Sequence, residues 1–417
     1  MLKVGALTFN MAVVPRALFK VMRRADLIPA VRERLERYPP PHDSHYGVVP
    51  SPPPEHVLRL GAAEPRHRAA LEAMARIDAL AGELADPYLI SRVLARREAV
   101  TSSAIEGTNS TLDELLVVEE TSDDAATAAA RQVRDYAAVL ERFLPKARTN
   151  GPVIFDRALV ADLHRAVMAG DPAYRDETGA LRSVVVWIGG GGDIAYSTYN
   201  PTPPGRVAAC LDDTLRYMSE PGRQIIDQSL LVRMAVAHAH FEAVHPFRDG
   251  NGRVGRLLMP LMMAAEGRTP LYLSPFMESH RDGYYAALKA AQQRLDWSAI
   301  VGFLADAVLG TEAELMATRR ALAQLERIWA RRRAFRAGST AARTLALLPH
   351  YPVVTARRLS ALLDVSFPAA AQALGALAAV GVVRERTGYA RNRVFAAPEA
   401  LAVLNRPFGE EPVLPER

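Results

Sequence analysis

The chain has 417 residues, 49% of them hydrophobic, and a formal net charge of +5. This is enough for about two or three domains with buried cores, and no charge-free apolar run of about 18 residues indicates a membrane span. Cys210 is the only cysteine, which excludes an intrachain disulfide and favours a reducing, cytoplasmic setting. The excess charge is mostly arginine spread along the chain, which is too little to indicate nucleic-acid binding.

The N-terminal part is predicted to be helical on both sides of a proline-rich stretch. Residues 1 to about 55 begin with a basic, helix-prone segment and continue into prolines at 39–54, which favour an extended path across the surface. Residues from about 65 to 146 are rich in Ala, Leu, Glu and Arg and predict helices. Within them Ser102 and Glu106 stand four residues apart, so a helix would place both on one face.

A β-hairpin is predicted after these helices. Residues 182–188 are rich in β-branched side chains, residues 189–192 are glycines, and residues 196–199 include two tyrosines. This order is typical of two strands joined by a glycine turn. An ordinary hairpin that covers a helix bundle is the alternative to a hairpin with a role in binding.

Two apolar helices are predicted around a loop of unusual composition. Residues 230–241 contain neither Gly nor Pro, and a second apolar run begins at Arg256 and reaches Ala265 before Gly267. Pro260 falls within the second run, where it can bend a helix without ending it. The connecting loop reads His-Pro-Phe-Arg-Asp-Gly-Asn-Gly-Arg-Val-Gly-Arg over residues 245–256.

Each residue type in this loop suits the handling of a nucleotide triphosphate. An imidazole accepts a proton near neutral pH, and a carboxylate holds a divalent cation such as Mg²⁺. Glycines let backbone N–H groups close on an anion, and arginines bind phosphate oxygens through paired hydrogen bonds. Asn251 and Gly252 lie near the start of the second helix, whose free N–H groups and positive dipole end favour anions. The loop is therefore predicted to be a phosphate cradle with a base beside it.

Other interpretations of the same region fit less well. Gly250, Gly252 and Gly255 match the spacing of the dinucleotide-binding fingerprint, but that motif follows a strand, and here a helix precedes it. No Walker P-loop sequence is present. His238 and His240 lie on different faces of the helix, unlike a zinc-binding pair, so they are predicted to be packed or hydrogen-bonded. A glycine-rich turn with solvated arginines would explain any single residue of the loop, but not the whole set.

The C-terminal part is predicted to form a small separate module. A charged helix over 312–336 leads to a boundary at 337–339. Helices are predicted over 341–348, 355–363 and 368–380, with a turn at 364–366, and Gly381 ends the third. A small hairpin with basic residues follows over 382–385 and 391–395. This order resembles a winged helix-turn-helix domain.

The loop at 245–256 resembles the signature of the Fic/DOC family, His-x-Phe-x-Asp/Glu-Gly-Asn-Gly-Arg-x-x-Arg, at every fixed position. The resemblance implies a mainly α fold with a helical core and a β-hairpin flap, and transfer of AMP from ATP to a protein hydroxyl. It implies that His245 is the general base and that Asp249 holds Mg²⁺. The remaining roles implied are core packing by Phe247, binding of the α-phosphate by Asn251 and the backbone near Gly250 and Gly252, and binding of the outer phosphates by Arg253 and Arg256.

Three further segments resemble parts of the same family. Residues 101–107 resemble its inhibitory helix, Ser/Thr-x-x-x-Glu-Gly/Asn, which implies that Glu106 pairs with Arg256 and keeps the γ-phosphate from docking; Ser102 is the first residue of that motif. The hairpin at 182–199 resembles the flap, which docks the target segment by strand pairing. Tyr284 and Tyr285 occupy a position where the family often has aromatics near adenine, although both are equally consistent with core residues.

These expectations define five parts. They are an N-terminal helical region, 1–146, with the inhibitory helix at about 101–112, a catalytic core, 147–312, a linking helix, 313–338, a winged helix-turn-helix, 339–400, and a tail, 401–417. The predicted function is a cytoplasmic protein adenylyltransferase that uses ATP and Mg²⁺ and is inhibited by Glu106.

Several alternatives remain open from the sequence. The same fold could remove AMP or transfer another nucleotide, and self-modification and a homodimer are both compatible with it. A DNA-binding regulator with a nucleotide-sensing core is the alternative from a different class. DNA binding is not favoured, because the predicted third helix offers only Gln372 as a base-reading side chain.

Overall fold

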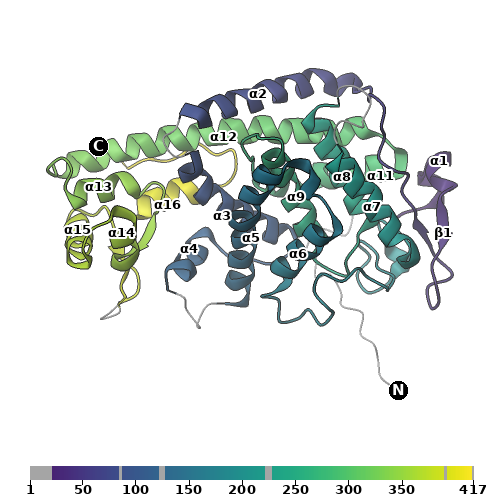
Figure 1. Ribbon diagram of the computed structural model, residues 1–417, viewed down its shortest axis with the longest axis horizontal. Coiled ribbons are helices and arrows are strands. Elements are labelled where there is room, and N and C mark those ends of the chain that lie inside the picture. The colour runs from purple at the N-terminus through teal and green to yellow at the C-terminus, as the bar shows by residue number, and fades with distance from the viewer. Residues whose placement is uncertain (1–20, 84–86, 122–126, 221–227, 389–391, 416–417) are drawn as a thin grey trace.

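The computed structural model describes residues 21–83, 87–121, 127–220, 228–388 and 392–415. The fold is mainly helical, as predicted, and its few strands lie near the two ends of the described chain (Figure 1). Within the described ranges no single helix is long and apolar enough to cross a membrane, and one pair of helices, bent by 112° at a short break, would pass only if taken together.

The N-terminal part forms the helices that the sequence predicts, preceded by a small hairpin that it does not. Its elements are η1 (Arg24–Asp26), α1 (Pro29–Arg32), β1 (Leu35–Arg37), β2 (Tyr46–Val48), η2 (Gly61–Ala63), α2 (Glu64–Glu83), α3 (Pro87–Ile105), α4 (Leu112–Thr121) and α5 (Ala128–Asn150). Strands β1 and β2 are antiparallel, with Leu35 opposite Val48. Most of the predicted basic helical start falls on residues 1–20, which lie outside the described residues.

Helix α3 ends earlier than the inhibitory helix predicted at about 101–112. Its last residue is Ile105, and Gly107 follows in the left-handed conformation with φ of +86°. The Gly107 N–H donates to the Ala104 carbonyl and the Thr108 N–H to the Ser103 carbonyl, both at 3.0 Å. This Schellman motif, made possible by glycine, closes the helix and leaves Glu106 at its C-terminal end.

The central part is built around two buried helices. Its elements are η3 (Gly151–Ile154), α6 (Arg157–Met168), η4 (Ile194–Tyr196), η5 (Pro204–Arg206), α7 (Val207–Ser219), α8 (Leu230–Val244), α9 (Asn251–Ala265), α10 (Ser274–Ser279) and α11 (Arg281–Arg294). Every residue of α8 is buried, including the polar and charged Arg233, His238, His240 and Glu242. Helix α9 continues through Pro260 to Ala265, as the sequence predicts.

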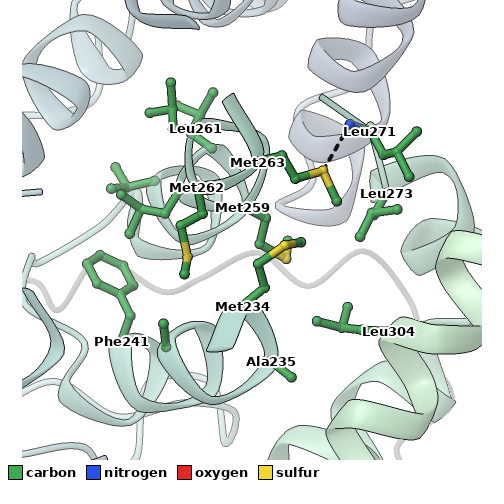
Figure 2. Packing of buried hydrophobic residues seen from close by; sticks show 14 of the residues in the cluster. Met234, Ala235, Phe241, Met259, Leu261, Met262, Met263, Leu271, Leu273 and Leu304 are labelled. Atoms are coloured by element: carbon green, nitrogen blue, oxygen red, sulfur yellow. Dashed lines mark hydrogen bonds between the residues drawn. The ribbon is translucent and has the colours of Figure 1, made fainter. Parts of the chain in front are cut away.

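Helices α8 and α9 pack against each other through large flexible side chains. Figure 2 shows Met234 and Phe241 of α8 facing Met259 and Met262 of α9, all four buried. Burying a Met or Phe side chain contributes roughly 1.5–3 kcal/mol. The two helices therefore form a fixed frame, and the loop at 245–250 joins their ends.

The hairpin predicted over 182–199 is not a regular one. The only pairing in this described stretch is a single antiparallel bridge between Ile188 and Tyr199, and residues 183–187 form no strand. Gly189, Gly190 and Gly191 all have positive φ, so the turn has the glycine conformations expected, but it joins segments that are extended without being paired along their length. The prediction of two strands here was wrong.

One long helix crosses the boundary between the predicted core and linking helix. Helix α12 (Trp297–Arg332) has 36 residues and runs alongside α2 (Figure 1). The predicted division at 312/313 therefore falls inside a continuous helix, which carries the chain from the core to the C-terminal module.

The C-terminal module contains the helices predicted for it, and also one strand and one helix that were not predicted. Its elements are α13 (Thr340–Leu347), β3 (Val353–Thr355), α14 (Ala356–Leu363), α15 (Phe367–Ala379), β4 (Arg384–Glu385), β5 (Val394–Ala396) and α16 (Pro398–Asn405). The sheet order is β3-β5-β4, with antiparallel pairing. The predicted start of the tail at 401 falls inside α16. The winged-helix assignment itself stays a prediction.

The module packs directly on the N-terminal helices. Leu112 and Leu116 of α4 share a buried apolar cluster with Val353, Val394 and Leu401. Glu120, close to the end of α4, accepts hydrogen bonds from the backbone N–H and the hydroxyl of Thr355, each at 3.2 Å. The C-terminal module is therefore docked against the segment that follows Glu106 in the chain.

Candidate active site

The signature loop joins α8 to α9 through two left-handed residues. His245 follows the last turn of α8 with φ of +51°, and its N–H donates to the Phe241 carbonyl at 2.9 Å. Gly250 precedes α9 with φ of +78°, and a Cβ there would lie 2.8 Å from Met168 Sδ. Glycine meets both requirements at this position, since it has neither the strain of a left-handed side chain nor the bulk.

Asn251 braces the loop from inside. Its Oδ1 accepts from the Phe247 N–H and its Nδ2 donates to the Phe247 carbonyl, both at 2.8 Å. Phe247 itself is buried, as the resemblance implies. The side chain of Asn251 is thus occupied by the loop backbone, so the predicted contact with an α-phosphate would have to come from its backbone N–H instead.

His164 supports the loop from α6, and no sequence pattern indicated this role. Its ring stacks on Phe247 with centroids 3.8 Å apart and planes 8° from parallel. The Gly179 N–H donates to its Nδ1 at 2.7 Å, so Nε2 carries the proton and donates to the Asp249 carbonyl at 3.1 Å. Burial lowers the pKa of His164 to about 4, with Arg253 contributing in the same direction, so the ring is neutral at physiological pH.

Arg182 holds the other side of the loop, and its role was also missed. Its Nε donates to the His245 carbonyl at 2.6 Å, and its Nη2 donates to the Val244 carbonyl at 3.2 Å and to the Thr202 carbonyl. Its Nη1 donates to the Val184 carbonyl at 2.9 Å. Burial lowers the pKa of Arg182 to about 10, because within the described chain only carbonyls and no carboxylate receive its charge. The buried guanidinium of Arg182 lies at the negative, C-terminal end of α8 and links the residues that follow this helix to the segment at 182–184.

Asp249 is the carboxylate closest in sequence to the start of α9. It is partly exposed, and its Oδ1 accepts from the Gly250 N–H at 2.6 Å. Mg²⁺ in nucleotide sites is usually held by one or two carboxylates together with substrate phosphates. The position of Asp249 fits that donor set, and within the described residues no cluster of three or more metal-binding side chains offers another.

Two arginines of α9 lie below the loop. Arg253 is 4% exposed, its Nη2 donates to Met168 Sδ at 3.1 Å, and its buried Nε has no hydrogen-bond partner among the described residues. Arg256 is 1% exposed. A buried guanidinium without an anion is costly, so Arg253 has unused capacity for an anionic ligand at the N-terminal end of α9.

Glu106 occupies that end of α9 and pairs with Arg256. The Arg256 Nη2 donates to Glu106 Oε1 at 2.6 Å, and Ser102 receives two further bonds from the same guanidinium. Burial lowers the pKa of Arg256, but Glu106 and the nearby Tyr284 raise it more, so the net pKa lies above its ordinary value. A Cβ on Gly252 would lie only 2.1 Å from Glu106 Oε1, so the carboxylate rests directly on the first turn of the helix.

Comparison with known proteins agrees with this geometry. Residues 65–142 match the model of the Fic/DOC family N-terminal region, and residues 154–263 match that of the Fic/DOC family. The chain thus carries a Fic/DOC family N-terminal region followed by a Fic/DOC family domain.

Curated Fic relatives resemble about a third of the chain. Protein adenylyltransferase fic-1 of Caenorhabditis elegans is 33% identical over 133 residues, which are 32% of this chain and 23% of that protein. Protein adenylyltransferase Fic of Drosophila erecta is 32% identical over 148 residues, 35% of this chain and 26% of that protein. The chain thus spans about a quarter of the length of these relatives. A Fic family protein from Desulfovibrio desulfuricans G20 has a TM-score of 0.49 at 20% identity, covering 82% of this chain and 98% of that one.

The two tyrosines that were expected near adenine differ from each other in burial. Tyr284 is 1% exposed, and its hydroxyl bonds to His238 Nε2 at 2.7 Å, so it is a core residue and cannot stack on a ligand. Tyr285 is partly buried and packs on the edge of the core. His240 bonds to the Thr214 hydroxyl at 2.8 Å, which together with the bond of His238 confirms that both helix histidines are packed and hydrogen-bonded.

A second buried carboxylate lies one turn before Ser102. Glu98 is 1% exposed and accepts from the Ser274 N–H at 2.9 Å, from the Ser274 hydroxyl and from the Tyr136 hydroxyl at 3.3 Å. Burial raises its pKa above the ordinary value. These bonds hold α3 against the start of α10 and so fix the helix that presents Glu106.

Proposed function

We propose that the protein is an adenylyltransferase that moves AMP from ATP to a hydroxyl side chain of a protein target. The observation that carries the proposal is the pairing of a complete signature loop with an anion site at the start of α9. Arg253 and Arg256 lie below that site, and His245 lies at the opposite end of the loop. The names of the curated relatives support the same reaction.

The chain's own residues supply positioning and charge. His245 would take the proton from the target hydroxyl, whose oxygen then attacks the α-phosphorus while the bond to pyrophosphate breaks. The N–H groups that begin α9 would hold phosphate oxygens, and Arg253 and Arg256 would bind the outer phosphates. Mg²⁺ bound at Asp249 would neutralise phosphate charge. A base placed in this way typically contributes about 10²–10⁴-fold to the rate.

Glu106 acts as an inhibitor in this proposal. Its carboxylate receives the Nη2 donor of Arg256 that a γ-phosphate would need, and both groups accept the same planar fork. Its contact with Gly252 also fills space beside the N–H groups of α9. The ATP-competent state therefore requires Glu106 to leave this position.

Incorporation of label from α-³²P-ATP tests the proposal. Wild type, Glu106→Gly and Glu106→Gly with His245→Ala are compared, first for label on the protein itself and then on lysate proteins. We expect weak label in wild type, strong label in Glu106→Gly and none in the double variant. No label in any of the three, with any nucleotide triphosphate, would reject transferase activity.

Removal of AMP is the closest alternative. It would depend on Glu106, so Glu106→Gly would abolish release of AMP from a modified protein while transfer appeared.

A regulator that binds DNA is the alternative from a different class, and its function would be unchanged by His245→Ala. Helix α15 presents Phe367 and Gln372 to solvent and no basic side chain, which favours a protein-binding role for the module over DNA.

The proposal places the protein in the cytoplasm, where ATP and a reducing environment are both present. Cys210 is its only cysteine, and it is buried. The proposed partner is the protein target. The labelling experiment tests for self-modification, and a sedimentation measurement tests for a homodimer.

A further inference from the structure

A buried carboxylate lies directly behind the proposed base. Glu242 is one turn before His245 on α8 and is 6% exposed. A Cβ on Gly255 would lie 2.6 Å from Glu242 Oε1, so the carboxylate fills the narrow space between α8 and α9. Neither the signature motif nor the reaction steps above include this residue.

Glu242 and His245 face each other with unmet hydrogen-bonding capacity. His245 Nδ1 lies 3.7 Å from Glu242 Oε2, which is longer than a hydrogen bond. His245 Nδ1 and Glu242 Oε1 are both buried and have no hydrogen-bond partner among the described residues. Buried polar atoms without partners are rare, and catalytic hydrogen bonds are often long before substrate binds. A shift of less than about 1 Å would bring Nδ1 and the carboxylate within bonding distance.

The charge of Glu242 is suited to this contact. Burial alone would raise the pKa of Glu242. The imidazoles of His245 and His238 and the guanidinium of Arg256 lower it by more than burial raises it, so the net pKa lies below the ordinary value. The residue is therefore ionised at neutral pH and can only accept hydrogen bonds. His238 already bonds to Tyr284 through Nε2, so its ring is held in place. The side chain of His245 makes no hydrogen bond among the described residues and only approaches Glu242.

We propose that Glu242 is a positioning residue that keeps the proton of neutral His245 on Nδ1, so that Nε2 carries the lone pair that accepts the target's proton. The proposal rests on the proposed role of His245 as base. The tautomer of a histidine is set by the hydrogen bond of its other nitrogen. During transfer the hydroxyl proton moves to Nε2, the ring becomes an imidazolium, and Glu242 stays ionised and stabilises that charge.

The tautomer can be measured without any enzymatic activity. The ¹⁵N chemical shifts of His245, in histidine-labelled full-length protein assigned by comparison with His245→Gln, distinguish a protonated Nδ1 from a protonated Nε2. We expect Nδ1–H in wild type and a shift towards Nε2–H in Glu242→Gln, because an amide can donate to Nδ1. Wild-type protein with Nε2–H would overturn the proposal by itself.

Kinetics provides the second readout, in the Glu106→Gly background. We expect Glu242→Gln to lower kcat by about 10²-fold or more and to leave KM for ATP nearly unchanged, since a lost orienting carboxylate affects the base and not the nucleotide. Glu242→Asp keeps the charge and should retain the Nδ1–H tautomer. Equal kcat for Glu242→Gln and its parent would contradict the proposal.

A matched control separates this role from loss of a buried charge. Glu266→Gln changes another poorly exposed carboxylate, which pairs with Arg233 at the far end of α9 and does not face the loop. It should leave both the tautomer and kcat unchanged. If Glu106→Gly itself transfers no label, the proposed function fails while the ¹⁵N measurement still decides the tautomer.

Discussion

Arg256 and Ser102 are joined by two hydrogen bonds from one guanidinium. The Nε donates to the Ser102 hydroxyl and Nη2 donates to the Ser102 carbonyl, both at 2.9 Å. Glu106, one turn further along the chain, accepts a third bond from Nη2. The end of α3 therefore binds Arg256 as a unit, and Glu106 supplies the carboxylate that we propose takes the place of a phosphate.

Replacement of Ser102 by Ala should weaken this inhibition without removing it. The variant loses the Oγ acceptor and leaves a buried Nε unsatisfied, which typically costs about 1–3 kcal/mol. The Glu106 contact remains. Self-labelling with α-³²P-ATP should therefore rise above wild type and stay below Glu106→Gly, and the effect of Ser102→Ala should shrink in the Glu106→Gly background because the residues act together.

Thr101→Ala is the matched control for this prediction. The Thr101 hydroxyl donates to the Arg97 carbonyl of its own helix at 2.7 Å and makes no contact with Arg256. Labelling at the wild-type level is expected for Thr101→Ala. A rise equal to that of Ser102→Ala would mean that any weakening of α3 releases the site, and that the hydroxyl has no specific role.

Replacement of Arg182 by Lys should impair transfer more than nucleotide binding. A single ammonium cannot reach the carbonyls of Val244, His245 and Val184 together, because the fork of the guanidinium spans them. Displacement of the base by about 1 Å can cost about 10²-fold in rate. Measured in the Glu106→Gly background, kcat should fall by roughly that factor while the ATP dissociation constant changes little.

Arg206→Lys controls for the same chemical change at the surface. Arg206 is exposed and pairs with Glu36, away from the loop. Its replacement should leave kcat and ATP binding as in the parent. If Arg182→Lys also behaves like the parent, the carbonyl contacts of Arg182 do not position the base.

The sequence predicted the two helices around the loop well, and the residues that support the loop poorly. His245, Glu106 and Arg256 stand in short motifs, and α8 and α9 follow from uninterrupted apolar runs, so local pattern was sufficient. Arg182 and His164 act from other segments through backbone carbonyls, and no spacing in the sequence reveals such contacts. Helix α3 ends at Ile105 because Gly107 adopts a positive φ, and helix propensity alone predicted a later end.

The predicted hairpin at 182–199 failed for a related reason. Its β-branched residues are typical of strands, but a strand needs a partner along its length, and here only Ile188 and Tyr199 pair. The side chain of Arg182 donates to backbone carbonyls at the end of α8. The backbone N–H of Arg182 donates to the Pro246 carbonyl at 2.9 Å. Tertiary contacts thus determine the path of this segment, and composition does not.

The buried ring of His164 predicts a pH dependence of stability. Burial lowers its pKa from 6.5 to about 4, so between these values the unfolded chain binds more protons than the folded one. Stability from this group is complete above the unfolded pKa and is lost as the pH falls. From pH 7 to pH 5 the loss should be about 2 kcal/mol, at about 1.4 kcal/mol per pKa unit.

Urea denaturation of wild type and His164→Gln at the two pH values measures this loss. The variant lacks the titrating ring, so its free energy of unfolding should fall less than that of wild type by about the same 2 kcal/mol. Other groups titrate equally in both proteins and cancel in the comparison. Parallel pH dependence of the two proteins would show that His164 is not held neutral by the fold.

Gly250 and Gly267 allow the strain of a left-handed residue to be separated from a steric clash. Both have positive φ, +78° and +72°, but a Cβ on Gly267 would meet no atom within 4 Å, whereas one on Gly250 would lie 2.8 Å from Met168 Sδ. Gly267→Ala should therefore cost only the backbone strain, about 1–2 kcal/mol. Gly250→Ala should cost a further 1–3 kcal/mol, roughly the cost of overpacking, as measured by urea denaturation.

The clash at Gly250 should also reach the nucleotide site. Met168 can move aside, because its side chain is flexible, but its sulfur accepts from Arg253 Nη2 at 3.1 Å, so that guanidinium must lose the bond or move with it. We expect Gly250→Ala to weaken ATP binding in the Glu106→Gly background, and Gly267→Ala to leave it unchanged. Equal ATP affinity in the two variants would show that Met168 yields without disturbing Arg253.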